Sequence, residues 1–373
     1  MHMKLHGLLS RCIAAAGSLF LCGSALAAVD VQVIAQGLNN PRGLSLAPNG
    51  WLYVAEVGSG GNGNCLPSPE EGQPPRCYGE TGSLARVDPD GIAPVKRVIT
   101  GLPSMAGPGG FAASSGPVDV DFWGTTPFIV MGWGGDPALR ASAGPKGKLF
   151  GQVLWALPNG KYFPLADISA HETRSNPDNT DIDSNPYGIL VQPGRQLVAD
   201  AGGNSIVASG AFAWIFGHEV TRTFAVLPRT ADDLDAVATT VVEGPDGYIY
   251  AGELTGAPFF RGASTIYRIP PFGGKPTPYV TGLTAVVDMA FDRRGTLYIV
   301  EIASGLVPGP GADPGVGVGR LLRKRRGHPV EVVFDQGLTF PSGIAIAHDG
   351  TLYMTNFGIF PGGGEVLKIS VAD

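Results

Sequence analysis

The side chains best suited to catalysis or metal binding are the last residues of a short sequence motif that recurs along the chain, which we call the phrase. Each phrase is an apolar strand closed by a polar residue, as in Leu52–Glu56 and Leu297–Glu301. Carboxylate and amide oxygens are the ligands that Ca²⁺ and similar hard cations take. We therefore consider four of the terminal acids as candidate metal ligands, with an asparagine at the matching place in the last copy: Glu56, Asp200, Glu253 and Glu301, then Asn356.

A second set of polar residues stands at the start of the strand that precedes a phrase. Its members are Arg42, Asp119, Tyr187 and Asp288. If these strands surround a common axis, the two sets together form an acidic funnel that could hold a ligand or a divalent cation. Crowded carboxyls have raised pKa values and can act as general acids or bases. The alternative is that polar strand ends cap neighbouring backbone groups, because buried polar atoms must be paired.

Several kinds of catalytic site have no signature in this sequence. It contains no Gly-x-Ser-x-Gly nucleophile elbow, no phosphate-binding loop and no dinucleotide fingerprint. We expect His328 and His348 on a face of short turns and His218 near a strand junction. His171 alone is expected near the opposite face, as a solvated residue at its rim. This distribution disfavours a Ser-His-Asp triad or a zinc hydrolase.

The elements that must position these residues are short strands in a repeat. The phrase occurs six times, once in the degenerate form Phe128–Met131. Each copy follows another apolar strand and a tight turn such as Asn49-Gly50 or Asp349-Gly350, which favours a hairpin. Two further strands follow each phrase. Four antiparallel strands repeated six times predict an all-β fold, a six-bladed β-propeller with four-stranded blades.

The two ends of the chain predict how the ring closes. The segment Val31–Leu38 matches the fourth strand of a repeat, whereas the last repeat stops after its third strand, Glu365–Ser370. The N-terminal strand should therefore complete the last blade, which removes two exposed sheet edges. A linear solenoid is the alternative, but it would need capping repeats. We predict one propeller domain over residues 28–373.

Loop lengths distinguish the two faces of the predicted propeller. The first-to-second turns are short, whereas long insertions join second to third strands at 58–83, 133–150, 255–264 and 304–319. They crowd one face, together with the acidic stretch 176–186. Such loops are where a rigid scaffold presents a binding site; tolerated decoration is the alternative. Trp133, Phe259 and Phe260 are aromatic candidates for this face.

The first 27 residues predict export. Lys4 and Arg11 precede the apolar run Cys12–Leu26, which ends in Ala25-Leu26-Ala27, the pattern of a cleaved signal peptide. A membrane anchor is the alternative. Cleavage would take the net charge from -6 to about -8, which argues against a nucleic-acid partner. We expect a periplasmic or secreted protein with no membrane span in the mature chain.

Two cysteines, Cys65 and Cys77, remain after cleavage. In an exported protein they most simply form one disulfide that closes a short surface loop. Free thiols or a metal pair are the alternatives.

One segment resembles a known family. Gly244–Phe259, with its Glu-Leu-Thr-Gly-x-Pro-Phe phrase, is similar to the ScyD/ScyE family of exported bacterial proteins. Asn40–Gly43, Asp183–Gly188 and Tyr267–Ile269 fit the same pattern, so the resemblance spans the mature chain. Ala199–Ile206 also looks like the core of an NHL repeat. The resemblance implies a propeller fold and an exported location, but no established catalytic residues.

Two functional hypotheses follow. The first is a binding or scaffold protein that presents its loop-rich face to a small molecule, a glycan or another protein. The second is a lactonase or related hydrolase, in which a Ca²⁺-like ion polarises a carbonyl and Asp200 or Glu301 activates water.

Overall fold

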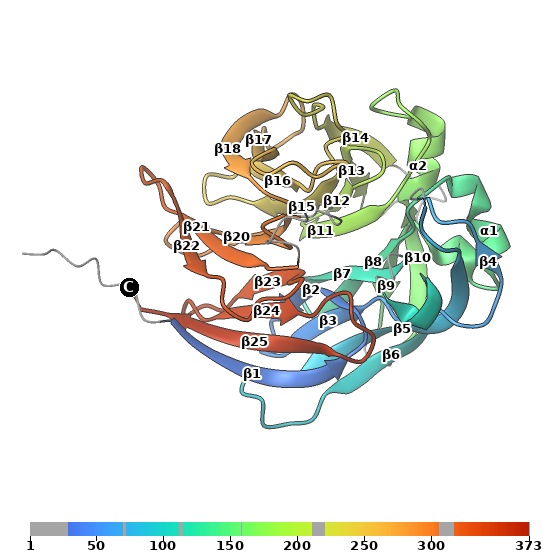
Figure 1. Cartoon of the computed structure of the whole chain (residues 1–373), viewed down its shortest axis with the longest axis horizontal. Coiled ribbons are helices and arrows are strands. Elements are labelled where there is room, and N and C mark those ends of the chain that lie inside the picture. Colours follow the sequence, from blue (N-terminus) through green and yellow to red (C-terminus); the bar gives the residue numbers. More distant parts are fainter. Residues whose placement is uncertain are drawn as a thin grey trace, which may run out of the picture.

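The computed structural model describes residues 29–372 apart from 70–71, 112–114, 158, 211–220 and 306–316. The predicted signal peptide and His218 lie outside these residues. Six antiparallel sheets surround a common axis and form a six-bladed β-propeller, as the repeats predicted (Figure 1). No helix in the described residues is both long and apolar enough to cross a membrane.

Each blade is a meander of four strands that runs outward from the axis. Blade 1 contains β2(Pro41–Leu46), β3(Leu52–Glu56), β5(Arg76–Val87) and β6(Lys96–Ala106), with the short β4(Cys65–Leu66) beside β5. Blade 2 contains β7(Gly116–Trp123), β8(Thr126–Gly132), β9(Gln152–Ala156) and β10(Tyr162–Asp167). Blade 3 contains β11(Pro186–Gln192), β12(Arg195–Asp200), β13(Ser205–Gly210) and β14(Thr221–Val226).

The remaining blades repeat this plan. Blade 4 contains β15(Ala238–Glu243), β16(Ile249–Glu253), β17(Ser264–Ile269) and β18(Thr277–Leu283). Blade 5 contains β19(Val286–Phe291), β20(Leu297–Glu301), β21(Arg320–Lys324) and β22(Val330–Phe334). Blade 6 contains β23(Gly343–Ile346), β24(Leu352–Asn356) and β25(Gly364–Val371), and its outermost strand is β1(Val29–Leu38).

The N-terminal strand closes the ring. β1 pairs antiparallel with β25, from Val29 opposite Val371 to Leu38 opposite Gly364 (Figure 1). Leu38 is completely buried in the core that blade 6 shares with blade 1. The predicted closure of the last blade is confirmed.

The insertions of blades 1 and 2 fold against each other above the loop-rich face. Their core is an apolar cluster of Tyr78, Met105, Trp133, Ala143 and Phe150. The buried Arg76 side chain ties the two insertions together, because it donates to Ser115 Oγ at 2.8 Å and to the carbonyl of Gly134 at 2.9 Å. These loops are therefore packed structure.

A disulfide and short helices lie in the insertions and in the connections that follow blades 1 and 2. Cys65 and Cys77 lie opposite each other on β4 and β5 and are joined by a disulfide, as predicted. Within the described part of the chain, the helical segments are three single 3₁₀ turns and two α-helices: η1(Pro108–Gly110), η2(Pro137–Leu139), η3(Gly147–Leu149), α1(Arg140–Ala143) and α2(Ile168–Ser175). Helix α2 begins at its N-cap Asp167, whose side chain accepts from Ala170 N at 2.8 Å.

Candidate functional site

Three of the four inner-strand residues considered from the sequence lie together near the axis. Asp119, Tyr187 and Asp288 line one small cavity, together with Ser342. Each aspartate braces two blades. Asp119 on β7 accepts from Ile189 N on β11 at 2.9 Å, and Asp288 on β19 accepts from Ile344 N on β23 at 2.8 Å. The inner strands of neighbouring blades are thus linked by carboxylates.

Burial raises the pKa values of the Asp119 and Asp288 carboxyls. Desolvation raises the pKa of Asp119 well above that of a free aspartate, and the nearby charge of Asp288 raises it further. Burial also raises the pKa of Asp288, against the hydrogen bonds from Ile344 and Thr240 that favour its charged form. The pair can therefore hold a proton at a pH where surface carboxyls are ionised.

A channel continues from this pair along the axis. It has a volume of about 270 Å³ and is lined by all six inner strands as far as their ends at the short turns, such as Leu46 and Phe291. Arg42, near the start of β2, is 6 % exposed and donates from Nη1 to the carbonyl of Gly358 in the β24–β25 loop.

Four phenylalanines lie close to this loop, and we call them the Phe360 cluster: Phe111, Phe340, Phe357 and Phe360. The ring of Phe360 lies 5.2 Å from that of Phe111 in a T-shaped contact, 5.7 Å from Phe357 and 6.3 Å from Phe340, centroid to centroid. They come from two connections between blades and from the loop between β24 and β25. Phe111 remains 50 % exposed. The cluster offers exposed aromatic surface on the loop-rich face, mainly the Phe111 ring, while the other three rings are half-buried.

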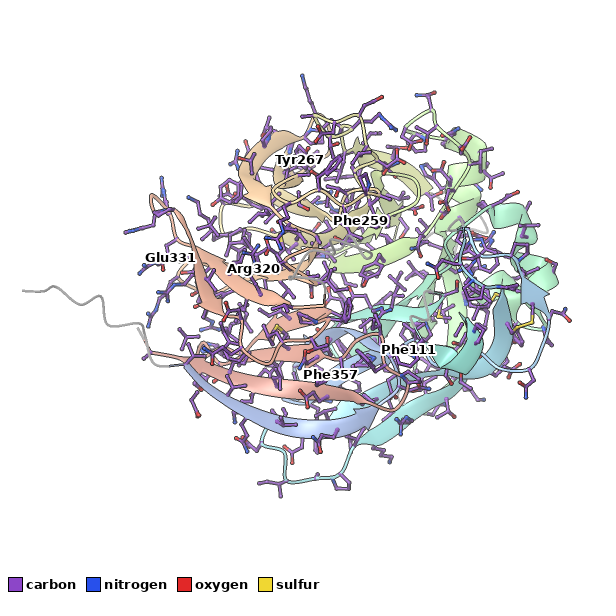
Figure 2. All side chains as sticks on the ribbon, in the orientation of Figure 1. Phe111, Phe259, Tyr267, Arg320, Glu331 and Phe357 are labelled. Atoms are coloured by element: carbon purple, nitrogen blue, oxygen red, sulfur yellow. A yellow bond between two sulfur atoms is a disulfide. The ribbon has the colours of Figure 1, made fainter. Side chains whose placement is uncertain are left out.

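The backbone of this face is held in unusual conformations. Phe340 and Phe357 have φ angles of 44° and 56°, and Phe259 on blade 4 has a φ angle of 60°. A bulky residue rarely adopts this left-handed region, and such strain gathers at ligand-binding positions. Phe111, Phe259 and Phe357 lie toward the middle of the ring in Figure 2.

The predicted second-strand residues occupy a different place. Glu56, Asp200, Glu253, Glu301 and Asn356 are all completely buried, so they do not line an open funnel. Four of them cap the backbone that enters their own blade. The donors are Asn39 N to Glu56 at 2.7 Å, Asn185 N to Asp200 at 2.6 Å, Thr284 N to Glu301 at 2.7 Å and Thr339 N to Asn356 at 2.8 Å.

Two of these acids also carry a salt bridge. Arg97 Nη2 lies 2.8 Å from Glu56 Oε1, and Arg320 Nη2 lies 2.5 Å from Glu301 Oε2. Glu253 differs because Asn204 accepts the corresponding backbone bond, from Val237 N at 2.9 Å. In the described residues no three His, Cys, Asp or Glu side chains are placed to hold a metal ion. The geometry that we see for this set is capping, which was the alternative.

His171 is not the solvated rim residue that we expected. It lies on α2, is 4 % exposed, and its Nε2 is 2.9 Å from Thr223 Oγ1. The repeat pattern did not predict this helix, which packs the His171 side chain against blade 3. Burial accordingly lowers the pKa of His171.

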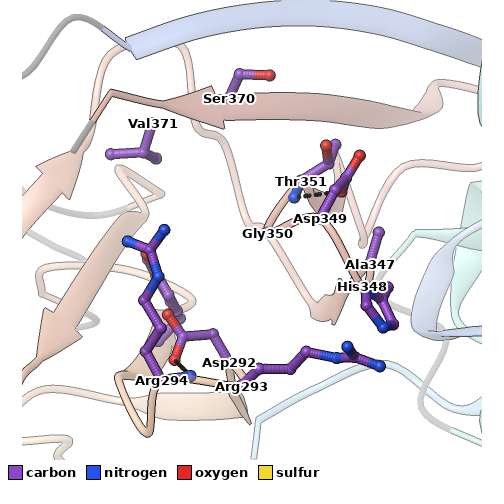
Figure 3. A pocket seen from close by; sticks show the side chains of 11 residues that line it. Asp292, Arg293, Arg294, Ala347, His348, Asp349, Gly350, Thr351, Ser370 and Val371 are labelled. Carbon is purple, nitrogen blue, oxygen red and sulfur yellow. Dashed lines mark hydrogen bonds between the residues drawn. The ribbon is translucent and has the colours of Figure 1, made fainter.

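A larger cavity of about 440 Å³ lies on the opposite, short-turn face between blades 5 and 6 (Figure 3). Its lining includes Arg293, Arg294 and His348, but also Asp292 and Asp349. The two acids accept from their own turns, at Arg294 N and Thr351 N. The mixed charges give this cavity no single preferred ligand, so the aromatic face remains the better candidate.

Comparisons with known proteins bear on the fold. No family model matches the chain, and no curated protein matches it. Solved structures do: a Bacteroides thetaiotaomicron protein of unknown function (10 % identity, TM-score 0.57, 92 % of this chain and 76 % of that one) and a glucose dehydrogenase (12 %, 0.54, 91 % and 99 %). A streptogramin B lyase is similar at 12 % identity and a TM-score of 0.50, over 92 % and 98 %. At such identities the likeness establishes the β-propeller fold alone.

Proposed function

We propose that this protein is an exported binding protein that holds its ligand on the loop-rich face, over the Phe360 cluster. The observation that carries the proposal is exposed aromatic surface held by strained backbone on the loop-rich face. Aromatic rings stack on flat apolar faces, so the ligand class that fits best is one with a ring, such as a sugar of a glycan. The insertion of blade 1 lies beside Phe111, because a Cβ atom built on the preceding Gly110 would be 2.6 Å from Ser59 Cβ.

Other observations fit the same proposal. The Cys65–Cys77 disulfide is of the kind that persists in the periplasm or outside the cell. Membership of the ScyD/ScyE family would agree with export, and it rests on the phrase around Glu253–Phe259. A protein partner that inserts an aromatic or apolar side chain would use the same surface.

Replacing Phe111 and Phe360 by alanine should weaken ligand binding at least tenfold, because stacking surface worth about 1.4 kcal/mol or more is lost. The mature protein would be applied to an array of neutral and acidic oligosaccharides, and the affinity for any glycan bound would be measured by calorimetry. Phe272→Ala is the matched control, since that ring is 86 % exposed in blade 4 on the short-turn side. Equal affinity of the double variant and the control would refute the site.

The hydrolase alternative has one observation in its favour. The buried Asp119–Asp288 pair has raised pKa values, as a general acid requires. A panel of lactones and esters, assayed with and without Ca²⁺, would test it. Turnover that is lost in Asp288→Asn would favour the hydrolase, whereas no turnover of any substrate by the mature protein would reject it.

A further inference from the structure

Two acidic side chains meet between α2 and the turn that follows β12. Glu172 on α2 is only 1 % exposed, and neither of its carboxylate oxygens has a hydrogen-bond partner among the described residues. A Cβ atom built on Gly203 would lie 2.5 Å from Glu172 Oε2 and 3.4 Å from Asp200 Oδ2. Both carboxylates therefore approach the same glycine, and only a residue without a side chain leaves room for them.

A buried hydroxyl beside Asp200 also lacks a partner. Ser205 is opposite Asp200 in the β12–β13 register, is completely buried, and has no hydrogen bond to Oγ in the described residues. The corresponding pair in blade 1 is Glu56 and Ser83, where the serine donates to the carboxylate. Aspartate is one methylene shorter than glutamate, so the same register in blade 3 leaves the Ser205 oxygen unused.

Further oxygen atoms come from the acidic stretch that follows α2. Asn176 ends the helix in a left-handed conformation, and its buried Oδ1 has no partner among the described residues. Asp178 accepts from Asn204 Nδ2 at 2.7 Å, and a Cβ atom built on Gly202 would lie 2.9 Å from Asp183 Cγ. The turn of residues 201–204 is thus surrounded by oxygen acceptors.

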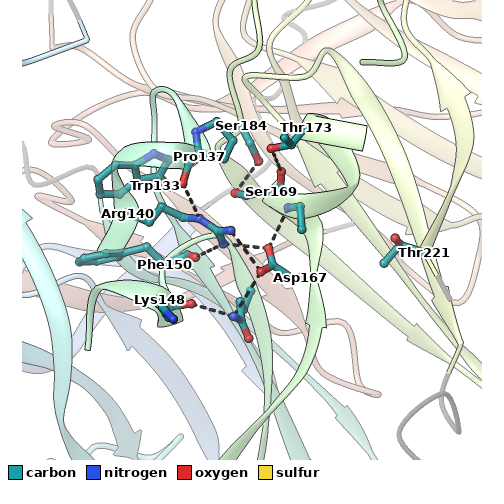
Figure 4. Close-up of polar contacts among 12 residues, drawn as sticks. Trp133, Pro137, Arg140, Lys148, Phe150, Asp167, Ser169, Thr173, Ser184 and Thr221 are labelled. Carbon is teal, nitrogen blue, oxygen red and sulfur yellow. Dashed lines mark hydrogen bonds and ion pairs between the residues drawn. The ribbon is translucent and has the colours of Figure 1, made fainter. Parts of the chain in front are cut away.

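The nearby cationic side chains are engaged elsewhere. Arg140 forms a two-pronged ion pair with Asp167, with distances of 2.8 and 3.1 Å (Figure 4). Arg174 donates to Thr221 Oγ1 at 2.9 Å. Burying a carboxylate without a donor or a counter-charge is costly. Glu172 has neither in the part of the chain that the structure describes, whereas Asp200 accepts from Ser184 Oγ at 2.8 Å and from Asn185 N at 2.6 Å. The unpartnered Glu172 beside a second carboxylate therefore calls for a positive charge that these arginines do not supply.

We propose that Glu172 and Asp200 form a calcium site that joins α2 to blade 3. The two carboxylates supply the charge, and the neutral oxygen of Ser205, with water, supplies the rest of the coordination. Ca²⁺ takes six to eight oxygen ligands in irregular geometry, whereas Mg²⁺ demands a near-ideal octahedron. Zn²⁺ would want nitrogen or sulfur ligands, and the nearby His171 is hydrogen-bonded to Thr223. The site shares only Asp200 with the four acids considered from the sequence.

Titration of Ca²⁺ into the mature protein, stripped beforehand with EGTA, tests this site. We expect saturable binding of one ion by calorimetry and a higher melting temperature in Ca²⁺ than in EGTA. Glu172→Gln should weaken binding at least tenfold and remove the Ca²⁺-dependent shift, because it deletes the charge at constant shape. Circular dichroism would check that this variant folds, and Asp200→Asn would provide a second disruption. Glu253→Gln is the matched control, since it replaces another completely buried glutamate on the next blade.

Three results would overturn the proposal. One is no saturable binding of Ca²⁺ by the stripped protein. Another is unchanged binding in Glu172→Gln, which would place any ion elsewhere. The third is loss of Ca²⁺ binding in Glu253→Gln while Glu172→Gln still binds Ca²⁺ as tightly as the wild type, which would point to the sequence-predicted acids instead. Glycan binding by the Phe360 cluster is measured separately, so failure of one proposal leaves the other intact.

Discussion

Removing β1 should abolish cooperative folding of the whole propeller. The strand is the outermost member of blade 6, and its Leu38 and Ile34 side chains lie in the core between blades 6 and 1. Without it, β25 would become an open edge and the ring would lose the pairing that joins its two ends. Circular dichroism melts of chains beginning at residue 29 and at residue 39 would show a sharp transition only for the longer chain.

Two controls separate closure from a general effect of truncation. A synthetic peptide of residues 29–38 should restore the transition of the truncated chain, and a scrambled peptide should not. Within the full strand, Leu38→Ala should cost about 2–5 kcal/mol, whereas Gln36→Ala, at an exposed position, should stay within about 0.5 kcal/mol. If the truncated chain melts at the same temperature as the full one, ring closure by β1 does not govern stability.

The fold could be predicted from local signals because each repeat carries its own. The phrases Leu52–Glu56, Ile249–Glu253, Leu297–Glu301 and Leu352–Asn356 coincide with β3, β16, β20 and β24. Their ends are set by turn glycines, such as Gly50 and Gly350 with φ angles of 83° and 93°. The repeat of apolar strands and the residues of the turns are local signals, so a single sequence is enough to show them.

The sequence predicted where each second-strand acid lies along its strand, but not the direction in which its side chain points. The predicted position at the end of each second strand was correct. Whether a side chain points to the axis or to its own blade depends on the backbone segment that enters that blade. Glu56 meets the N–H group of Asn39, and Glu301 that of Thr284, before either could reach the axis. The inner-strand acids Asp119 and Asp288 do reach it, because those strands surround it.

The Phe360 cluster and Glu172 lie outside the repeated strands. Phe111 and Phe360 meet although they are far apart in sequence and lie in irregular connections. Glu172 lies on α2, a two-turn helix inside a connection between blades, where the strand pattern gives no guide. The Asp167 cap at its start was the available signal. Tertiary contacts between loops, which sequence periodicity does not encode, decided both features.

Glu253→Gln should stabilise the protein at high pH and leave it unchanged near pH 4.5. Burial raises the pKa of Glu253 to about 8, from 4.5 in an exposed chain, although Thr265 and Tyr267 partly favour its charged form. The folded protein therefore keeps a proton that the unfolded chain has lost. The stability of the wild type should fall as the pH rises from 4.5 through 8, because folding must either retain that proton or bury the charge.

The glutamine variant has no such proton, so its advantage should grow over that window to about 2–4 kcal/mol at pH 9. Urea unfolding in EGTA at pH 5, 7 and 9 would measure it. The difference between variant and wild type isolates Glu253 from the other buried acids, which titrate in both proteins. Glu331→Gln is the control on the surface, where Arg325 and Arg323 lower the pKa of the carboxyl. Glu331 is ionised in both the folded and the unfolded chain from pH 5 to 9, so the difference between this variant and the wild type should stay nearly constant over that range. Parallel profiles for wild type and Glu253→Gln would mean that Glu253 is ionised in the folded protein at neutral pH, with Thr265 and Tyr267 stabilising its charge.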